Sequence, residues 1–193
     1  MTALLTDKRE IFKALLGFET SCLRHQSLVE KNATEQGYWE GVVYRVHDYH
    51  LTSAIDVVDE IINPPEITPV PGSTSWLLGL ANIRGNLVAV VDIGGYLFNQ
   101  RTPQTAGSRL LMTSVHNYPL GIFVDGVLGQ RHFDYVQRID ANSDMGKEKQ
   151  QIPEQLIRHI NHGYEQSDRR WWVLDLERFT SQQSFLDAGK VEA

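Results

Sequence analysis

Short apolar segments joined by tight turns are the feature that most restricts how this chain can fold. The clearest example is the pair Trp76–Arg84 and Leu87–Val91, which the dipeptide Gly85-Asn86 connects. Because glycine and asparagine both tolerate a positive φ, this dipeptide predicts a tight hairpin with Arg84 at its shoulder. Similar turns are predicted at Asp48-Tyr49 and Asn117-Tyr118. Many short strands with regular turns favour small β-barrels.

A short internal repeat in the sequence suggests that there are two such barrels. Val90–Ile93 resembles Val173–Leu176, and each copy places an aspartate at the end of an apolar strand. Asp92 and Asp175 are therefore expected to cap the helices that follow them, since aspartate is a preferred N-cap residue. Two copies of one strand–aspartate–helix unit predict two similar barrels side by side.

The remaining parts of the chain are expected to be accessory to this β domain. Residues 1–38 form a predicted N-terminal helical extension, in which Asp7 is the cap and Glu10 stands in the capping-box position. The apolar face of that helix either packs on its own domain or docks on a partner. The β domain spans 39–186 and ends in a helix from Leu176 to about residue 186, and 187–193 form a fraying tail.

Composition excludes several classes of function. The chain has 193 residues and a net charge of −6, which argues against binding to nucleic acid because phosphate neutralisation needs clustered Lys and Arg. No apolar run is long enough to span a bilayer, and no signal-peptide core precedes the domain, so a cytoplasmic protein is expected. The single cysteine, Cys22, cannot form an internal disulfide.

No catalytic or cofactor-binding pattern is found. The sequence lacks the glycine-rich phosphate loops and the nucleophile elbow, and no cofactor is expected. Asp92 and Asp175 can be considered as paired acids, but their shared context favours helix caps. His159 and His162 have the spacing of two metal ligands on a helix, yet a full ligand set is missing, so a solvated pair is expected instead of a metal site.

Several motifs in the same order resemble the CheW-like domain family. These are Val58–Ile61, Ile67–Pro71, Gly79–Asp92 and Gly121–Val127. The second segment fits the family's Ile-Thr-x-Val-Pro, and the third fits its Gly-x-x-Asn-Leu-Arg-Gly followed by an apolar strand that ends in aspartate. The match covers roughly residues 40–180. His47 stands where the family customarily has glycine, and this divergent pattern looks like the PilI branch, which serves type IV pili and twitching motility.

The resemblance implies a mainly β fold of two five-stranded SH3-like barrels that share a core, with helices at both ends. It implies no catalysis. Members of this family are adaptors in chemotaxis-type signal transduction, and their partners are a CheA-like histidine kinase and a methyl-accepting chemoreceptor, here of the PilJ type. No nucleic acid and no direct membrane insertion are expected.

The resemblance also implies roles for individual residues. Glu60 and Arg84 are expected to form a charged pair near the receptor-binding region, with Val58 as an apolar contact. Asn82 is expected to bond the backbone of the hairpin and to fix the approach of Arg84. Two glycines are expected to be structural: Gly85 serves the turn and Gly79 allows close packing. The alternative for Arg84 is an ordinary hairpin arginine.

Two other functions are also compatible with the sequence. A decoy or scaffold with the same fold would occupy a receptor without supporting the kinase. A small-barrel enzyme or ligand-binding protein would need a deep pocket with convergent polar groups and strongly perturbed titrating residues.

Overall fold

The computed structural model describes residues 37–115, 118–140 and 154–180. The predicted helix over 1–38 lies outside them as far as residue 36, and so do the end of the C-terminal helix and the tail 187–193. The chain divides into two units, 1–39 and 40–193. The description below concerns the second unit, together with the start of the strand that leads into it.

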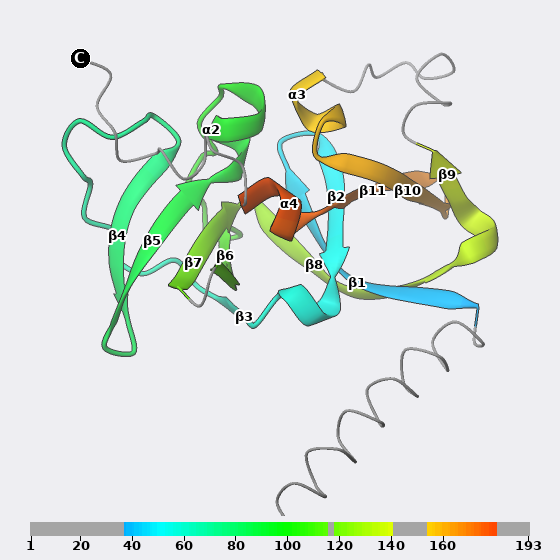
Figure 1. The fold of residues 1–193 in the computed structure, drawn as a ribbon, viewed down its shortest axis with the longest axis horizontal. Coiled ribbons are helices and arrows are strands. Elements are labelled where there is room, and N and C mark those ends of the chain that lie inside the picture. Colours follow the sequence, from blue (N-terminus) through cyan, green and yellow to red (C-terminus); the bar gives the residue numbers. More distant parts are fainter. Residues whose placement is uncertain (1–36, 116–117, 141–153, 181–193) are drawn as a thin grey trace, which may run out of the picture. The chain divides into compact units, whose positions relative to one another are not determined.

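The described residues form two β-sheets in which most strand pairs are antiparallel (Figure 1). The six-stranded sheet has the order β8-β1-β2-β11-β10-β9, and the five-stranded sheet has the order β3-β6-β7-β5-β4. The first consists of β1 (Tyr38–Val46), β2 (Tyr49–Ala54), β8 (Gly126–Asp134), β9 (Arg138–Asp140), β10 (Ile160–Gln166) and β11 (Arg169–Leu174). The second consists of β3 (Glu60–Ile62), β4 (Leu77–Ile83), β5 (Asn86–Asp92), β6 (Arg109–Val115) and β7 (Tyr118–Val124).

The helices within the described residues are all short. They are the α-helices α2 (Ile93–Phe98), α3 (Glu154–Ile157) and α4 (Leu176–Thr180), and the 3₁₀ turns η1 (Ile55–Val57) and η2 (Tyr135–Gln137). The chain is therefore mainly β, as its turn pattern predicts. One detail differs from the expected pair of five-stranded barrels, because β9 adds a sixth strand to one sheet. Its counterpart in the other sheet is only an isolated bridge between Thr68 and Leu80.

The two sheets repeat one arrangement. Each sheet contains an antiparallel hairpin, β1–β2 in one and β6–β7 in the other. The second strand of each hairpin pairs in parallel with a strand that precedes a helix: β2 with β11, and β7 with β5. The hairpin and its parallel partner come from opposite halves of the chain. Two similar units have thus exchanged their hairpins, and this duplication accounts for the sequence repeat between the β5–α2 and β11–α4 segments.

The barrels share a central core and also have cores of their own. Leu51 of β2 and Ile122 of β7 belong to one cluster that both sheets line. Phe123 belongs to a second cluster inside the five-stranded barrel. Inside the six-stranded barrel, Phe133 stacks on Tyr164 with 4.9 Å between ring centroids. Burial of these side chains from both sheets supplies the main stabilisation of the fold.

Three helices meet in the shared core. The Tyr96 ring of α2 lies edge-on to Phe179 of α4 at 4.9 Å, and His159, just after α3, contacts Phe179 at 5.3 Å. His159 is 4% exposed. Burial, then Arg178 and Arg158, lowers the pKa of His159. The expected solvated pair is therefore wrong for His159, because the chain turns from α3 into a strand and buries this ring.

The prediction places all three hairpin turns one residue too far toward the C-terminus. Val46 pairs with Tyr49, Ile83 with Asn86 and Val115 with Tyr118, so each second turn residue of the prediction is already in a strand. The first turn is His47-Asp48, where His47 has φ 51° in the left-handed region. Its N–H donates to Asp125 Oδ2 at 2.6 Å, which holds this conformation without the customary glycine.

Candidate protein-interaction site

Arg84 lies in the turn between β4 and β5. The turn residues are Arg84 and Gly85, with φ values of 52° and 84°. Both therefore occupy the left-handed region, as the two central residues of a type I′ hairpin turn must. The prediction placed the turn at Gly85-Asn86 with Arg84 at its shoulder, and the structure instead places glycine second. This one-residue shift lifts Arg84 to the tip of the hairpin, where its side chain is 74% exposed.

Glu60 of β3 pairs with this arginine. Arg84 Nη2 donates to Glu60 Oε1 at 2.5 Å, and the Glu60 side chain is 35% exposed. β3 and β4 are the two edges of the five-stranded sheet, so the pair joins those edges and closes the barrel at this end. An exposed pair of this kind stabilises the fold by only about 0–1 kcal/mol, because water screens both charges.

Asn82 fixes the shape of the hairpin tip. Its Oδ1 accepts a hydrogen bond of 2.9 Å from the Gly85 N–H. Val58, by contrast, follows η1 and is half-buried, with its side chain packed against the central cluster. The structure therefore brings Glu60, Asn82 and Arg84 together, while Val58 belongs largely to the core below them.

Gly79 allows a close backbone approach that no other residue tolerates. Its φ is 143°, and a Cβ atom there would lie 2.1 Å from the carbonyl oxygen of Thr68. Thr68 and Leu80 exchange two backbone hydrogen bonds of 2.8 and 2.9 Å at this point. Gly85 differs, since a Cβ atom there would meet nothing within 4 Å and only its positive φ requires glycine.

The two aspartates differ in what their side chains do. Asp175 caps α4, because its Oδ1 accepts a hydrogen bond of 2.9 Å from the Arg178 N–H. Asp92 stands at the N-cap position of α2 but makes no capping bond. Its buried carboxylate instead accepts from Thr102 N at 2.8 Å and Thr102 Oγ1 at 2.6 Å. The expected cap is wrong for Asp92, because the loop after α2 folds back over the carboxylate and supplies two hydrogen-bond donors from Thr102.

Two exposed apolar residues near the starts of β5 and β7 are absent from the sequence prediction. Leu87 is 70% exposed and Tyr118 is 76% exposed. The parallel register of β5 and β7 begins with Ala89 and Leu120, and Leu87 and Tyr118 each stand two residues before that pair, at the same end of the sheet. Leu87 also faces Asn82 across the hairpin. The only sequence signal was an apolar residue directly beside each turn.

A shallow groove runs along the same edge. It has a volume of about 450 Å³ and is lined by Pro65, Glu66, Thr68, Leu80, Asn82 and Leu87. We call the surface formed by Glu60, Asn82, Arg84, Leu87 and Tyr118 the hairpin-tip surface. It combines one exposed ion pair with exposed apolar side chains, which is the mixture typical of protein interfaces.

A neighbouring groove of about 600 Å³ carries little chemistry. Its lining includes one carboxylate, Glu66, and one guanidinium, Arg101, among mainly apolar residues and prolines. Within the described ranges, no three His, Cys, Asp or Glu side chains converge as metal ligands would. No helix in this part of the chain has the length and apolar character needed to cross a membrane.

Comparison with known proteins assigns the fold to a family. The family model described as the CheW-like domain matches residues 40–183. This chain belongs to the CheW-like family. It is similar to the protein PilI of Pseudomonas aeruginosa, with 25% identity over 95% of this chain and 98% of that protein. That match along nearly the whole length supports the PilI branch within the family.

More distant relatives agree with this assignment. The chemotaxis protein CheW of Thermotoga maritima is 28% identical over 47% of this chain and 60% of its own length. A solved structure, the scaffolding protein TtCheW of Thermoanaerobacter tengcongensis, superposes with a TM-score of 0.62 at 17% identity and covers 79% of this chain and 96% of that one. The predicted CheW-like fold is thus confirmed, and the chain is a chemotaxis-type, CheW-like signalling protein.

Proposed function

We propose that this CheW-like protein is a non-catalytic adaptor of the cytoplasm, which couples a methyl-accepting receptor of the PilJ type to a CheA-like histidine kinase. The similarity to PilI along 95% of the chain supports a role in the signalling that controls type IV pili and twitching motility. The hairpin-tip surface carries the proposal, since it offers an arginine on a turn that a hydrogen bond fixes, and two exposed apolar side chains at the starts of β5 and β7.

The contact proposed for Arg84 follows from its geometry. Asn82 fixes the turn and Glu60 orients the guanidinium, so the planar group is presented to solvent in a defined direction. Arginine recognises carboxylates and carbonyls through paired N–H donors, and it is enriched among the residues that dominate binding energy. Leu87 and Tyr118 add apolar area that a partner can cover.

Reconstitution tests the function directly. The receptor's cytoplasmic part, the kinase and this protein are mixed, and kinase autophosphorylation is followed with each component omitted in turn. An adaptor raises the rate only when all three are present. A protein that binds the receptor and leaves the rate unchanged is a decoy, and that result would overturn the coupling role. Turnover of a small molecule without partners would instead indicate an enzyme.

A further inference from the structure

We propose that the outer end of the six-stranded barrel binds an acidic segment of a partner protein through Arg45, Arg131 and Arg169. This inference goes beyond the adaptor function and does not depend on which partner supplies the segment. It concerns the barrel opposite to the hairpin-tip surface, and it starts from one tryptophan, Trp171 of β11.

One row of side chains crosses this barrel. Arg45 of β1 pairs with His50 of β2, and the His50 ring lies edge-on to Trp171 at 5.2 Å. Trp171 in turn pairs with Tyr164 of β10. Neighbours in one row of a sheet point to the same face, so a cation, an imidazole and two aromatic rings follow one another across four strands.

Two more arginines cover the tryptophan. The guanidinium carbons of Arg131 and Arg169 lie 4.8 and 5.7 Å from the centroid of the Trp171 ring. Trp171 is 1% exposed, and its indole N–H has no acceptor among the described residues. Stacking on the ring holds both guanidinium groups in place, so a ligand that binds them loses little side-chain entropy.

These three arginines differ from the paired arginines of the protein. Arg84, Arg158 and Arg170 each contact a carboxylate. Within the described ranges Arg45, Arg131 and Arg169 have no such partner, and Arg131 Nη1 donates only to the neutral Gln166 Oε1 at 3.2 Å. Among the described residues, the positive charges of these three arginines are therefore not neutralised by a carboxylate.

The positive charges of Arg169 and Arg45 affect the neighbouring imidazole of His50. Burial, then Arg169 and Arg45, lowers the pKa of this imidazole. Asp48 and Asp168 lie in the turns beside His50 and Arg169, and neither forms an ion pair with the three arginines. A carboxylate from outside relieves this repulsion, and charge-assisted bonds to guanidinium are among the stronger hydrogen bonds in proteins.

The chemistry favours an acidic protein segment over nucleic acid. The chain has a net charge of −6, and no lysine lies in the described ranges, so the described residues offer no extended basic track for a phosphate backbone. A small group of preoriented guanidinium forks instead matches a few carboxylates, which bind such forks in a bidentate manner.

The test uses the full chain and a hexaglutamate peptide, with hexalysine as the opposite-charge control. The protein is labelled with ¹⁵N, and its indole N–H signals are followed by NMR, with Trp171→Phe identifying the relevant signal. We expect hexaglutamate to shift the Trp171 signal in a saturable way that weakens with salt. Combined Arg131→Gln and Arg169→Gln substitution should weaken binding by about tenfold or more, the usual effect of losing bonds to charged groups.

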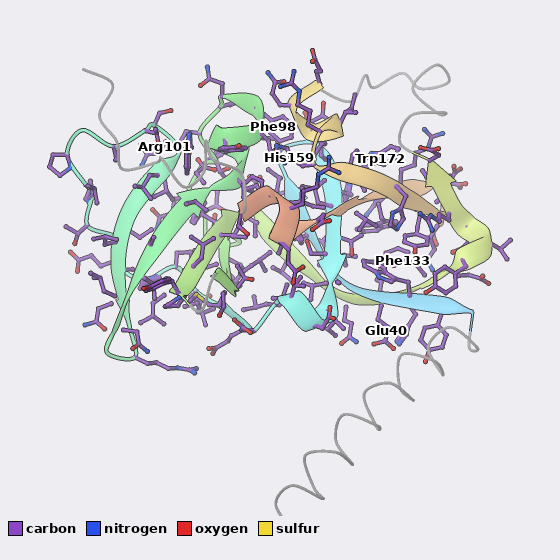
Figure 2. The ribbon with its side chains drawn as sticks, in the orientation of Figure 1. Glu40, Phe98, Arg101, Phe133, His159 and Trp172 are labelled. Carbon is purple, nitrogen blue, oxygen red and sulfur yellow. The ribbon has the colours of Figure 1, made fainter. Side chains whose placement is uncertain are left out.

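Arg101→Gln is the matched control. Arg101 is also exposed and forms no ion pair in the described ranges, and Figure 2 shows it on the other barrel, away from Phe133. Because the double substitution also removes the stacking on Trp171, Arg45→Gln provides a variant that leaves the ring covered and should still weaken binding. Circular dichroism confirms that each variant is folded.

Several results would overturn the proposal. An unmoved Trp171 signal excludes the site, and equal weakening by Arg101→Gln shows only a general charge effect. If inorganic phosphate binds as tightly as the peptide, the site takes small anions and not an acidic segment. If sedimentation shows self-association that Arg169→Gln abolishes, the occupant is a second copy of this chain.

Discussion

Reversing the charge of Arg84 separates a contact residue from a structural one. In Arg84→Glu two carboxylates meet at the edge between β3 and the β4–β5 turn. Arg84 is 74% exposed and Glu60 is 35% exposed, so the free energy of unfolding should change by only about 1 kcal/mol. The binding free energy for receptor or kinase should weaken by about 2 kcal/mol or more, which is about a 30-fold rise in Kd.

The exchange of both charges sharpens this test. Glu60→Arg combined with Arg84→Glu restores an attractive pair between the two edges of the barrel but reverses the polarity that a partner meets. Stability should therefore return close to that of the unaltered protein, while binding stays weak. Such a cycle isolates the interaction between the two residues from their separate effects.

Two measurements decide the outcome. Urea unfolding gives the stability of each variant, and calorimetry with the receptor's cytoplasmic part and with the kinase gives the affinities. Unchanged affinity of Arg84→Glu for both partners would refute the contact role. Recovery of binding in the double exchange would also refute it, because the pair would then act only by closing the barrel.

Four further residues give predictions that rest on separate contacts. Gly79→Ala should destabilise the fold by about 3 kcal/mol in urea unfolding, since it combines a strained φ with a clash that breaks two backbone hydrogen bonds. Gly85→Ala should cost only about 1 kcal/mol, because only its φ is strained. Equal costs for the two variants would contradict the close approach at Gly79. Asp92→Ala should cost about 1–3 kcal/mol because the loop after α2 loses its buried acceptor, and an unchanged urea midpoint would argue against this. Because the pKa of folded His159 is below its unfolded value of about 6.5, its contribution to stability is present above that pH and is lost as the pH falls through the folded pKa. When the pH is lowered from 7.5 to 5.5, the free energy of unfolding of His159→Phe should therefore fall by less than that of the unaltered protein, and the difference is the contribution of the His159 titration. Urea unfolding at the two pH values measures it.

The sequence revealed the type of each local element better than its register. Turn-forming residues identified all three hairpins, but Gly85 alone does not say whether it is the first or the second turn residue. The register comes from the strand pairing and from distant bonds such as His47 N–H to Asp125. A sequence pattern contains no direct information about those contacts, which is why the three turns were placed one residue late.

Long-range pairing also explains what the site prediction missed. Leu87 and Tyr118 are far apart along the chain, and they come to the same end of the sheet only because β5 and β7 pair in parallel. Asp92 shows the opposite error, since its local context is that of a helix cap while its actual donors come from Thr102. The binding roles of Val58, Glu60, Asn82 and Arg84 remain predictions.

The hairpin-tip surface combines a rigid backbone with a weakly held charged side chain. The backbone is fixed by the close approach at Gly79 and by the Asn82 bond within the turn. The guanidinium of Arg84 is held only by an exposed ion pair, which contributes little to stability. If Arg84 contacts a partner as we propose, the partner can take over its guanidinium at almost no cost to the fold, and the hairpin around it does not need to be reordered. This division of roles allows an adaptor to bind and release partners while its own barrel stays intact.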